Sequence, residues 1–480
     1  MAAAATELAA HLESPAGRGH TPARALTGAA GGATCGDLVR VSLAVNEDGA
    51  IHDAGFDASG CATVIAAGSA TVSLVTGTDL LAAARVGPRE IAAELGGLGA
   101  AGAHAAELAA DALHRALGSA ARGRVGLTAT PGRTLVAMSG GVDSATAALL
   151  AAREGEAVGV TLELWSDAEN DGAQSCCSAQ SVRAARTLAH ELGMPHLSID
   201  LREEFRAGVV EEWLSDHAAG LTPNPCVRCN GSVRLDAMLE LASRLGAATL
   251  ATGHYARVTD GPLLRVAADG AKDQSYVLCA LSPASLSRLR FPLGEMEKPA
   301  VRDLAEHHGI PVARRPDSQD LCFLAGTGRE RFLERHGGLG ARDGDLVDET
   351  GRRIGTHTGA HRFTVGQRRG LGVSAPEPYF VLATDAVSNT VTVGPRAALL
   401  AHRFPLRDVT LHAHGREVDG VRVRAHGRMR SAALSEALPV GRHARAQLTL
   451  AEPAERTAPG QIACLYRGDV VVGHATIAAR

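Results

Sequence analysis

Residues 134–144 read TLVAMSGGVDS, and this stretch decides the fold of the central part of the chain. Its first five residues predict a short buried strand, and a helix is expected after the glycines, through residues 145–153. The segment AVGVTLEL at residues 157–164 predicts the next strand. A strand–helix–strand unit of this kind predicts a parallel sheet with helices on both faces, which is an α/β fold.

The turn SGGVDS at residues 139–144 is suited to an anion. Its glycines let backbone N–H groups converge on a phosphate, the following helix N-terminus adds a positive dipole, and the serines supply hydroxyl donors. The competing interpretation is an ordinary glycine turn capped by Ser or Asp. In its strand–turn–helix setting, however, the motif resembles the PP-loop of ATP pyrophosphatases, which cleave ATP between the α and β phosphates.

Length and composition restrict the other possibilities. A chain of 480 residues allows two to four domains, and a net charge of −4 means that any nucleic-acid contact must come from a local patch. An odd count of nine cysteines and the lack of a secretory pattern argue against a disulfide scaffold. The longest apolar stretch, residues 61–75, is too short to span a bilayer. We therefore expect a cytoplasmic protein that does not enter a membrane.

Composition shifts divide the chain. We expect a disordered tail at residues 1–30, a compact α+β unit at 31–120 and a linker at 121–132. The α/β catalytic domain should follow at residues 133–330. Short alternating strands with frequent Gly turns then predict a small central domain at residues 331–395 and a β-barrel domain at 396–480.

Two segments bring thiols into polar, Pro-rich or Asp-rich loops. TPNPCVRCN at residues 222–230 contains Cys226 and Cys229, and DSQDLCF at residues 317–323 contains Cys322. A CxxC pair can be thioredoxin-like, half of a zinc site or, with a distant Cys, three ligands of an iron–sulfur cluster. No second CxxC completes a zinc site, since Cys176 and Cys177 are adjacent. These loops point to reactive thiols.

Residues 133–480 resemble the tRNA-specific 2-thiouridylases, the MnmA/TrmU family. The resemblance is carried in order by AMSGGVDS, TPNPCVRCN, ATGHYAR, KDQSYVL, FPLGEMEKPAVR, DSQDLCF and TVGQRRGLG. It implies a PP-loop catalytic domain of the adenine nucleotide alpha hydrolase type. It also implies that ATP, with Mg²⁺, adenylates the C2 oxygen of uridine 34 in the tRNA anticodon stem-loop, and that a sulfur nucleophile then displaces AMP.

The resemblance also assigns roles to residues. It implies that ATP is held by Ala137, Met138, Ser139, Gly140, Gly141, Val142, Asp143, Ser144, Leu162 and Gly253. It implies that the target base is lined by Asn224, Pro225 and Cys226. The tRNA contacts that it implies are His254, Lys272, Asp273, Gln274, Gln367, Arg428 and Met429. Met429 replaces the aromatic residue that the family usually has at this place, so base stacking there is not assured.

Two versions of the sulfur step follow from the same resemblance. In one, Cys322 carries a persulfide and Cys229 is the nucleophile that resolves it, which leaves a Cys229–Cys322 disulfide. In the other, Cys226, Cys229 and Cys322 hold an iron–sulfur cluster with one open iron that binds sulfide. The sequence leaves both versions open and favours the persulfide slightly.

The N-terminal unit resembles the IscU/NifU-type scaffold proteins of iron–sulfur cluster assembly. Cys35, Asp37, Cys61 and His104 match the ligand positions of that family, but Ala105 replaces its third Cys. The four matching residues form a possible metal site, and a degenerate docking domain is the alternative. Fusion to a sulfur-consuming enzyme implies intramolecular delivery from a cysteine desulfurase.

The alternative from a different class of function is an iron–sulfur scaffold protein whose PP-loop domain serves only as an RNA-binding or regulatory module. The joint presence of SGGVDS, CxxC and Cys322 argues against it. Amide-forming PP-loop ligases have no use for the three cysteines. The sequence does not determine the oligomeric state, the set of tRNAs or the desulfurase.

Overall fold

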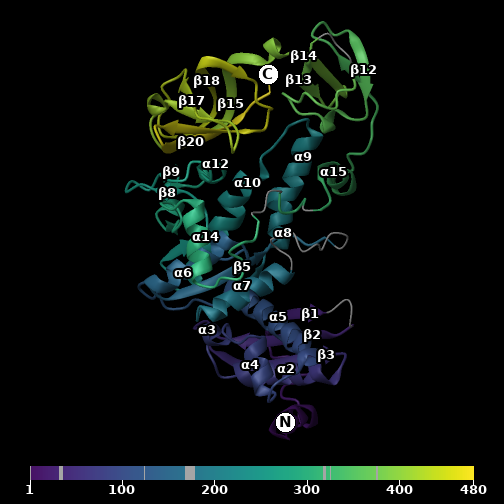
Figure 1. Ribbon diagram of the computed structural model, residues 1–480, viewed down its shortest axis with the longest axis vertical. Coiled ribbons are helices and arrows are strands. Elements are labelled where there is room, and N and C mark those ends of the chain that lie inside the picture. The colour runs from purple at the N-terminus through teal and green to yellow at the C-terminus, as the bar shows by residue number, and fades with distance from the viewer. Residues whose placement is uncertain are drawn as a thin grey trace.

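The computed structural model describes residues 2–31, 36–123, 125–167, 179–316, 321–324, 326–373 and 377–479. Figure 1 shows an elongated molecule with the N-terminal domain at one end, the parallel-sheet domain in the middle and two β-rich units at the other end. In the described part of the chain, no helix has both the length and the apolar character needed to cross a membrane.

The N-terminal domain packs helices on one antiparallel sheet of order β1-β2-β3. Its strands are β1 (Leu26–Gly31), β2 (Leu38–Val45) and β3 (Ile51–Ser59). Its helices are α1 (Ala2–Glu13), α2 (Ala62–Val75), α3 (Leu80–Ala83), α4 (Pro88–Glu94) and α5 (Ala100–Gly123). Alternation in β2 buries Val39, Val41 and Leu43 completely against α5 and α2, as expected for a sheet with one covered face.

The expected disordered tail at residues 1–30 is wrong. These residues form α1 and β1, and α1 packs on α2, where His11 Nδ1 lies 2.8 Å from Ser69 Oγ. The alanine-rich composition that suggested disorder instead lets α1 lie close to its neighbour, because Ala has high helix propensity and little bulk. The linker expected at residues 121–132 also begins later, since α5 continues to Gly123.

The middle domain has a parallel sheet of order β10-β7-β4-β5-β6, which confirms the α/β prediction. Its strands are β4 (Thr134–Ala137), β5 (Ala157–Glu163), β6 (His196–Asp200), β7 (Thr249–Ala251) and β10 (Leu289–Arg290). The helices up to the cysteine loop are α6 (Val142–Glu154), α7 (Ala179–Glu191), α8 (Arg202–Phe205) and α9 (Glu211–Ala218). Those beyond it are α10 (Pro225–Arg228), α11 (Asp236–Arg244), α12 (Ser275–Leu278), α13 (Pro283–Leu286), α14 (Lys298–His307) and α15 (Arg329–Gly337). Strand β5 is buried along its whole length, as a central strand covered on both faces should be.

Two π-helical stretches interrupt the helices of this domain: η1 (Arg206–Val210) between α8 and α9, and η2 (Cys229–Leu235) between α10 and α11. π-Helical turns are rare and are frequent at functional sites. η2 starts at the second cysteine of the CxxC pair and leads directly into α11.

The C-terminal third consists of two β units, as predicted. The first is a sheet of order β12-β11-β14-β13, built from β11 (Gly344–Val347), β12 (Arg353–His357), β13 (Tyr379–Asp385) and β14 (Thr390–Pro395). The second is a barrel of β15 (Leu400–Leu411), β16 (Gly420–Arg422), β17 (Arg430–Leu434), β18 (Gly441–Glu455), β19 (Ile462–Arg467) and β20 (Val470–Ile477), closed by the pairing of β15 with β20. The short hairpin β8 (Arg257–Val258) and β9 (Leu264–Arg265) extends the middle domain onto β20.

The N-terminal and middle domains share one hydrophobic core, in which α5 packs against β6. A Cβ atom at Gly118 of α5 would overlap the carbonyl oxygen of Ser198 in β6, so only glycine permits this approach. Two nitrogens of Arg115 donate to the carboxylate of Glu163 at the end of β5, each at 3.0 Å. The N-terminal domain is thus held rigidly on the edge of the parallel sheet.

Candidate active site

The glycine turn predicted to hold phosphate lies between β4 and α6 at the carboxyl end of the sheet. Gly140 has a φ of +74°, in the region that favours glycine, and a Cβ there would lie 2.9 Å from Ser181 O. Ser144 Oγ accepts a hydrogen bond from Ser139 N at 3.1 Å and donates one to Gly141 O at 3.0 Å. The first turn of α6 has backbone N–H groups without intrahelical acceptors, so the turn presents donors to an anion.

This turn opens into a cavity of about 500 Å³, which we call the cradle cavity. It is lined by the predicted residues Ala137, Ser139, Gly140, Gly141, Val142, Asp143, Ser144, Gly253, His254, Lys272, Asp273 and Gln274. Its further lining residues are Ser181, Arg234, Thr252, Tyr255, Ala271, Arg315, Pro316 and His426. The basic side chains among them make the cavity suited to a polyanion such as the triphosphate of ATP.

Gly253 and His254 close the cradle cavity from the loop after β7. A Cβ at Gly253 would lie 2.6 Å from Ser144 N and 2.7 Å from Asp143 C, so a side chain there would fill the cradle. His254 Nδ1 lies 2.8 Å from Thr252 Oγ1. Burial and the charge of Arg234 lower the pKa of His254 to about 3, so its imidazole is neutral. A neutral His254 can orient a ligand by hydrogen bonds but adds no positive charge.

Asp143 of the turn is held by two residues that the sequence reasoning did not place in the site. The buried Lys298 donates from Nζ to both carboxylate oxygens of Asp143, at 2.7 and 2.8 Å, and Tyr255 OH donates to Oδ1 at 2.8 Å. Lys298 is one of only two lysines in the chain, but sequence spacing could not reveal its partner, which lies 155 positions away.

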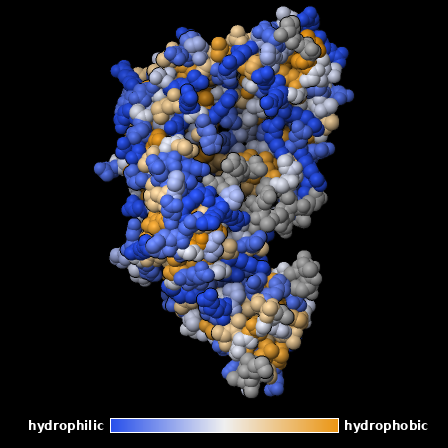
Figure 2. All heavy atoms as spheres, viewed as in Figure 1, coloured by the Kyte–Doolittle hydropathy of each residue, from blue (hydrophilic) through white to orange (hydrophobic). Residues whose placement is uncertain are grey.

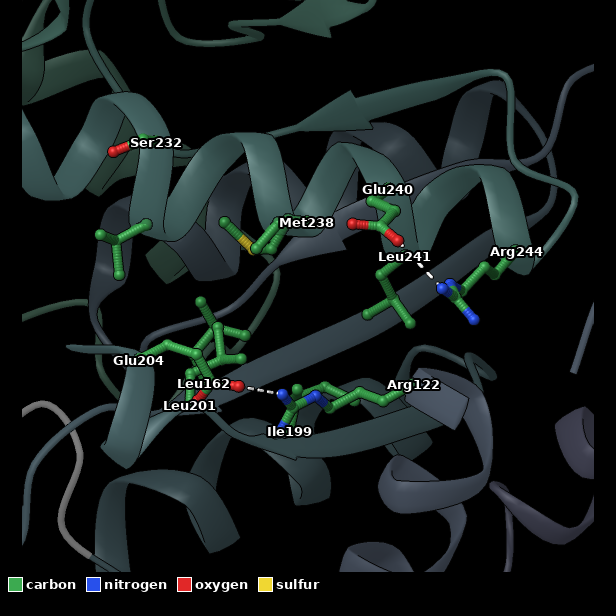
Figure 3. Close-up of a pocket in the computed structure, with 12 residues that line it drawn as sticks. Arg122, Leu162, Ile199, Leu201, Glu204, Ser232, Met238, Glu240, Leu241 and Arg244 are labelled. Atoms are coloured by element: carbon green, nitrogen blue, oxygen red, sulfur yellow. Dashed lines mark hydrogen bonds and ion pairs between the residues drawn. The ribbon is translucent and has the colours of Figure 1, made fainter. Parts of the chain in front are cut away.

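Leu162, predicted to contact ATP, lies between two further cavities. The smaller one, of about 20 Å³, adjoins the cradle cavity and has mostly apolar walls; it is lined by Ala137, Met138, Ser139, Val160, Thr161, Leu162, Leu164, Arg234 and Met238. The larger one, of about 340 Å³, is shown in Figure 3. There Leu162 and Met238 point into an apolar space rimmed by the pairs Arg122–Glu204 and Arg244–Glu240.

The cysteine loop is held by its own residues and by the barrel. Asn224 Oδ1 accepts from Cys226 N at 3.1 Å and so caps α10, while Pro225 is buried. Thr222 N donates to Pro459 O at 2.8 Å, and Gln461 Nε2 donates to Thr222 O at 2.6 Å. Asn224 and Pro225, predicted to line the base site, thus brace the loop, and Cys226 remains partly exposed.

Cys229 and Cys322 lie in one apolar cluster, in which Cys229 is buried and Cys322 is partly buried. Burial raises the pKa of the Cys226 thiol, and the charge of Arg234 acts against this. Among the described residues, no group of three or more Cys, His, Asp or Glu side chains is arranged to hold a metal ion. The three thiols therefore do not form a ready cluster site in this conformation.

The segment around Lys272 contacts both the cavity and the barrel. Gln274 Oε1 accepts from Tyr255 N at 2.9 Å. Asp273, predicted to contact tRNA, is buried: it accepts from Ser275 Oγ at 2.7 Å and pairs with Arg422 of the barrel. In this structure the Asp273 carboxylate links the middle domain to the barrel, and its contact with tRNA stays a prediction. Lys272 remains on the cavity wall.

The other predicted tRNA-binding segments meet near the cavity mouth. The Gln367 side chain stabilises its own turn. Its Oε1 accepts a hydrogen bond from Thr364 N at 3.1 Å, and its Nε2 donates one to Arg369 O at 2.9 Å. A Cβ at Gly366 would lie 3.8 Å from Arg424 of the barrel, which places the two segments side by side. In the same barrel loop Arg428 and Met429 are exposed, while His426 reaches the cradle cavity. Figure 2 shows hydrophilic surface over much of this end of the molecule.

The candidate scaffold site of the N-terminal domain is partly assembled. Cys61 N donates to Asp37 Oδ1 at 2.9 Å, and Cys61 Sγ lies 3.4 Å from Asp37 Oδ2. His104 lies on the first turns of α5 and pairs with Glu107 at 3.9 Å. Ala105, in place of a third Cys, is buried in the core, and Cys35 lies outside the described residues.

The parallel sheet, the glycine cradle and the cysteine loop define a protein of the PP-loop class, here joined to a scaffold-like domain. Family descriptions match in the same order: "NifU-like N terminal domain" at residues 5–124, "tRNA methyl transferase HUP domain" at 132–326, "tRNA methyl transferase PRC-barrel domain" at 330–395 and "Aminomethyltransferase beta-barrel domain" at 402–477. The chain belongs to the tRNA-specific 2-thiouridylase family, in the bifunctional NifU/MnmA form.

This assignment rests on close relatives. The chain is 43% identical to the bifunctional protein NifU/MnmA of Rubrobacter xylanophilus over 98% of its own length and 97% of the relative's. It is 44% identical to the tRNA-specific 2-thiouridylase MnmA of Thermobifida fusca over 72% of this chain and 95% of that protein.

Solved structures show more distant likenesses. A U34-tRNA thiolase NcsA from Methanococcus maripaludis, solved with its 4Fe-4S cluster, matches with 16% identity and a TM-score of 0.27 over 40% of this chain and 61% of that one. The N-terminal part of a NifU-like protein from Brucella abortus matches with 20% identity and a TM-score of 0.15 over 24% of this chain and 80% of that one. These scores are too low to carry a functional argument.

Proposed function

We propose that the protein uses ATP to replace the C2 oxygen of uridine 34 in tRNA by sulfur. The observation that carries this proposal is the π-helix η2, which begins with Cys229 and contains Arg234, a residue of the cradle cavity wall. One short element thus joins a thiol to the place suited to a triphosphate. Membership of the 2-thiouridylase family supplies the substrate class.

Adenylation is the first step of the proposed reaction. The N–H groups of the glycine turn, together with Lys272, hold the phosphates, and the adenine is directed toward Leu162. Mg²⁺, bound with ATP, would reduce the charge of the triphosphate. The C2 oxygen of the uracil ring attacks the α-phosphorus, and the bond to pyrophosphate breaks. The poor oxygen leaving group is thereby converted into an ester of AMP.

Sulfur transfer follows. The terminal sulfur of a persulfide on Cys322 attacks C2, and AMP leaves with the oxygen. The Cys229 thiolate then attacks Sγ of Cys322, and the electron pair of the broken S–S bond stays on the tRNA sulfur. The products are 2-thiouridine and a Cys229–Cys322 disulfide, which an external dithiol must reduce before the next turnover.

An iron–sulfur cluster is the alternative way to present sulfide. Because the described residues gather no set of three ligands for a metal ion, no step is assigned to such a cluster here. Cys226 then has the simpler role of lining the base site next to the buried Cys229.

The N-terminal domain is proposed to pass sulfur from a cysteine desulfurase to the catalytic domain. A chain of contacts supports this: His104 pairs with Glu107, which pairs with Arg183 at 3.2 Å on α7, and Ser181 on the same helix lines the cradle cavity. Cys35→Ala and Cys61→Ala should slow thiolation driven by a desulfurase and spare thiolation from free sulfide. Equal losses with both sulfur sources would refute this role.

The activity itself is tested with the purified full-length chain, a tRNA transcript, ATP, a cysteine desulfurase with L-cysteine as the source of persulfide sulfur, and a dithiol that reduces the disulfide, under aerobic and anaerobic conditions. Mass spectrometry of the nucleosides should show 2-thiouridine only when ATP is present. Cys229→Ser should abolish the product, while Cys279→Ser, a buried cysteine outside the site, should not. Absence of 2-thiouridine under all conditions would refute the proposal. A tRNA substrate supports the further proposal that this reaction takes place in the cytoplasm.

A further inference from the structure

Arg234 lies on the boundary between two cavities of the catalytic domain. It lines the cradle cavity with the glycine turn, and it lines the small cavity with Met138, Leu162 and Met238. Apart from Arg234, only Ala137 and Ser139 belong to both linings, and both are part of the strand and turn that lead into α6. A nucleotide with its phosphates in the cradle cavity and its base directed toward Leu162 would place the α-phosphate at this boundary.

One nitrogen of the half-buried Arg234 guanidinium is not satisfied by the described part of the protein. Its Nε is buried without a hydrogen-bond partner in the described part of the chain, where no carboxylate forms an ion pair with it either. Lys298, by contrast, is bound by Asp143 at 2.7 Å, and Arg422 by Asp273. A buried, unpaired charge is costly, so an anionic ligand is the natural partner of Arg234.

The π-helical form of η2 places Arg234 on the same face of the helix as the Cys229 thiol. π-Helical hydrogen bonds join residues five apart, so Cys229 and Arg234, which are five apart, lie one turn from each other on one face. The charge of Arg234 also acts on the Cys226 thiol and on His254. Arg234 therefore lies among the cysteine loop, the Gly253 loop and the glycine turn.

We propose that Arg234 is a catalytic residue that binds the phosphate joining AMP to the C2 oxygen of uridine. When sulfur attacks C2, the C–O bond breaks and its electron pair goes to the phosphate oxygen, so AMP gains a negative charge. A planar guanidinium can meet two phosphate oxygens at once and stabilise that charge in a site sheltered from water. This inference rests on the proposed function and adds to it the residue that assists departure of AMP.

The first test compares the binding of AMP and of adenosine to the full-length protein by calorimetry. Arg234→Met should weaken AMP binding about tenfold to a hundredfold and leave adenosine binding unchanged, because only AMP carries the phosphate. Arg234→Lys should fall between. Arg228→Met is the matched control, since Arg228 lies six residues earlier in the same helical segment, is exposed and pairs with Glu212, and it should alter neither affinity. The proposal is overturned if Arg234→Met weakens the binding of AMP and of adenosine equally, or if it leaves both affinities unchanged.

The second test is a single-turnover reaction with ATP labelled at the α-phosphate. Arg234→Met should slow conversion of adenylated tRNA to AMP and 2-thiouridine by about 10²- to 10³-fold, with partial recovery in Arg234→Lys. A rate within threefold of wild type would overturn the role of Arg234. Failure of the wild-type protein to make 2-thiouridine would instead refute the proposed function, so the two failures are distinguishable.

Discussion

Gly253 lies where the loop after β7 touches the first turn of α6. Because a Cβ there would lie 2.6 Å from Ser144 N, Gly253→Ala should push into the space of the phosphates and raise the KM for ATP by tenfold or more. Gly261→Ala is the control, since a Cβ at Gly261 meets nothing within 4 Å. Steady-state kinetics with tRNA and sulfide measures both, and an unchanged KM in Gly253→Ala would contradict the assignment of the cradle.

At the scale of single residues, the sequence predicted the residues whose roles depend on a short local motif. The glycine turn, Gly253 and the cysteine loop could be found because each motif is contiguous. Arg234, Tyr255 and Lys298 could not, since their roles depend on partners far away in the chain. The burial of Asp273 against the barrel could not be predicted either, because its partner Arg422 lies 149 positions away in the chain.

At the scale of elements, α5 is the joint between the two halves of the molecule. Gly118→Ala would force α5 away from Ser198 of β6, and overpacking of this kind costs about 1–3 kcal/mol of unfolding free energy. Gly123→Ala on the same helix meets nothing within 4 Å and should be neutral or stabilising, since Ala favours helix. Denaturant unfolding compares the two variants, and a stabilising Gly118→Ala would show that α5 does not pack on β6 as described.

The helices and strands themselves were largely predictable from hydrophobic periodicity. Strands β4 and β5 fall within a residue or so of their predicted bounds, and α6 contains the helix expected at residues 145–153. The π-helix η2 was not predicted, because an extra residue in a turn leaves little trace in the pattern of apolar residues. Helix α1 was missed because Ala-rich segments resemble disordered ones when their packing partner is unknown.

At the scale of the whole molecule, buried histidines make the fold sensitive to acid. Burial lowers the pKa of His217 and His474 to about 4 from an ordinary value of 6.5, and it lowers the pKa of His114 and His196 at the domain interface well below that value. Between about pH 6.5 and 4 the unfolded chain therefore binds protons that the folded chain does not.

The free energy of unfolding should consequently fall as the pH drops from 6.5 toward 4, by up to about 1.4 kcal/mol per pH unit for each such histidine. Above pH 6.5 these histidines should contribute no pH dependence. Urea titrations at several pH values measure the slope, and His474→Gln should reduce it, because it removes one of the groups. A slope that His474→Gln leaves unchanged would contradict a buried, neutral His474.

The central claim is that ATP activates the C2 oxygen of the wobble uridine for replacement by sulfur. The most direct measurement follows that oxygen, using an anticodon stem-loop whose uridine 34 carries ¹⁸O at C2. After thiolation by the full-length protein, mass spectrometry should find one ¹⁸O in the phosphate of AMP for each 2-thiouridine formed. Formation of 2-thiouridine with AMP that contains no ¹⁸O would contradict the account.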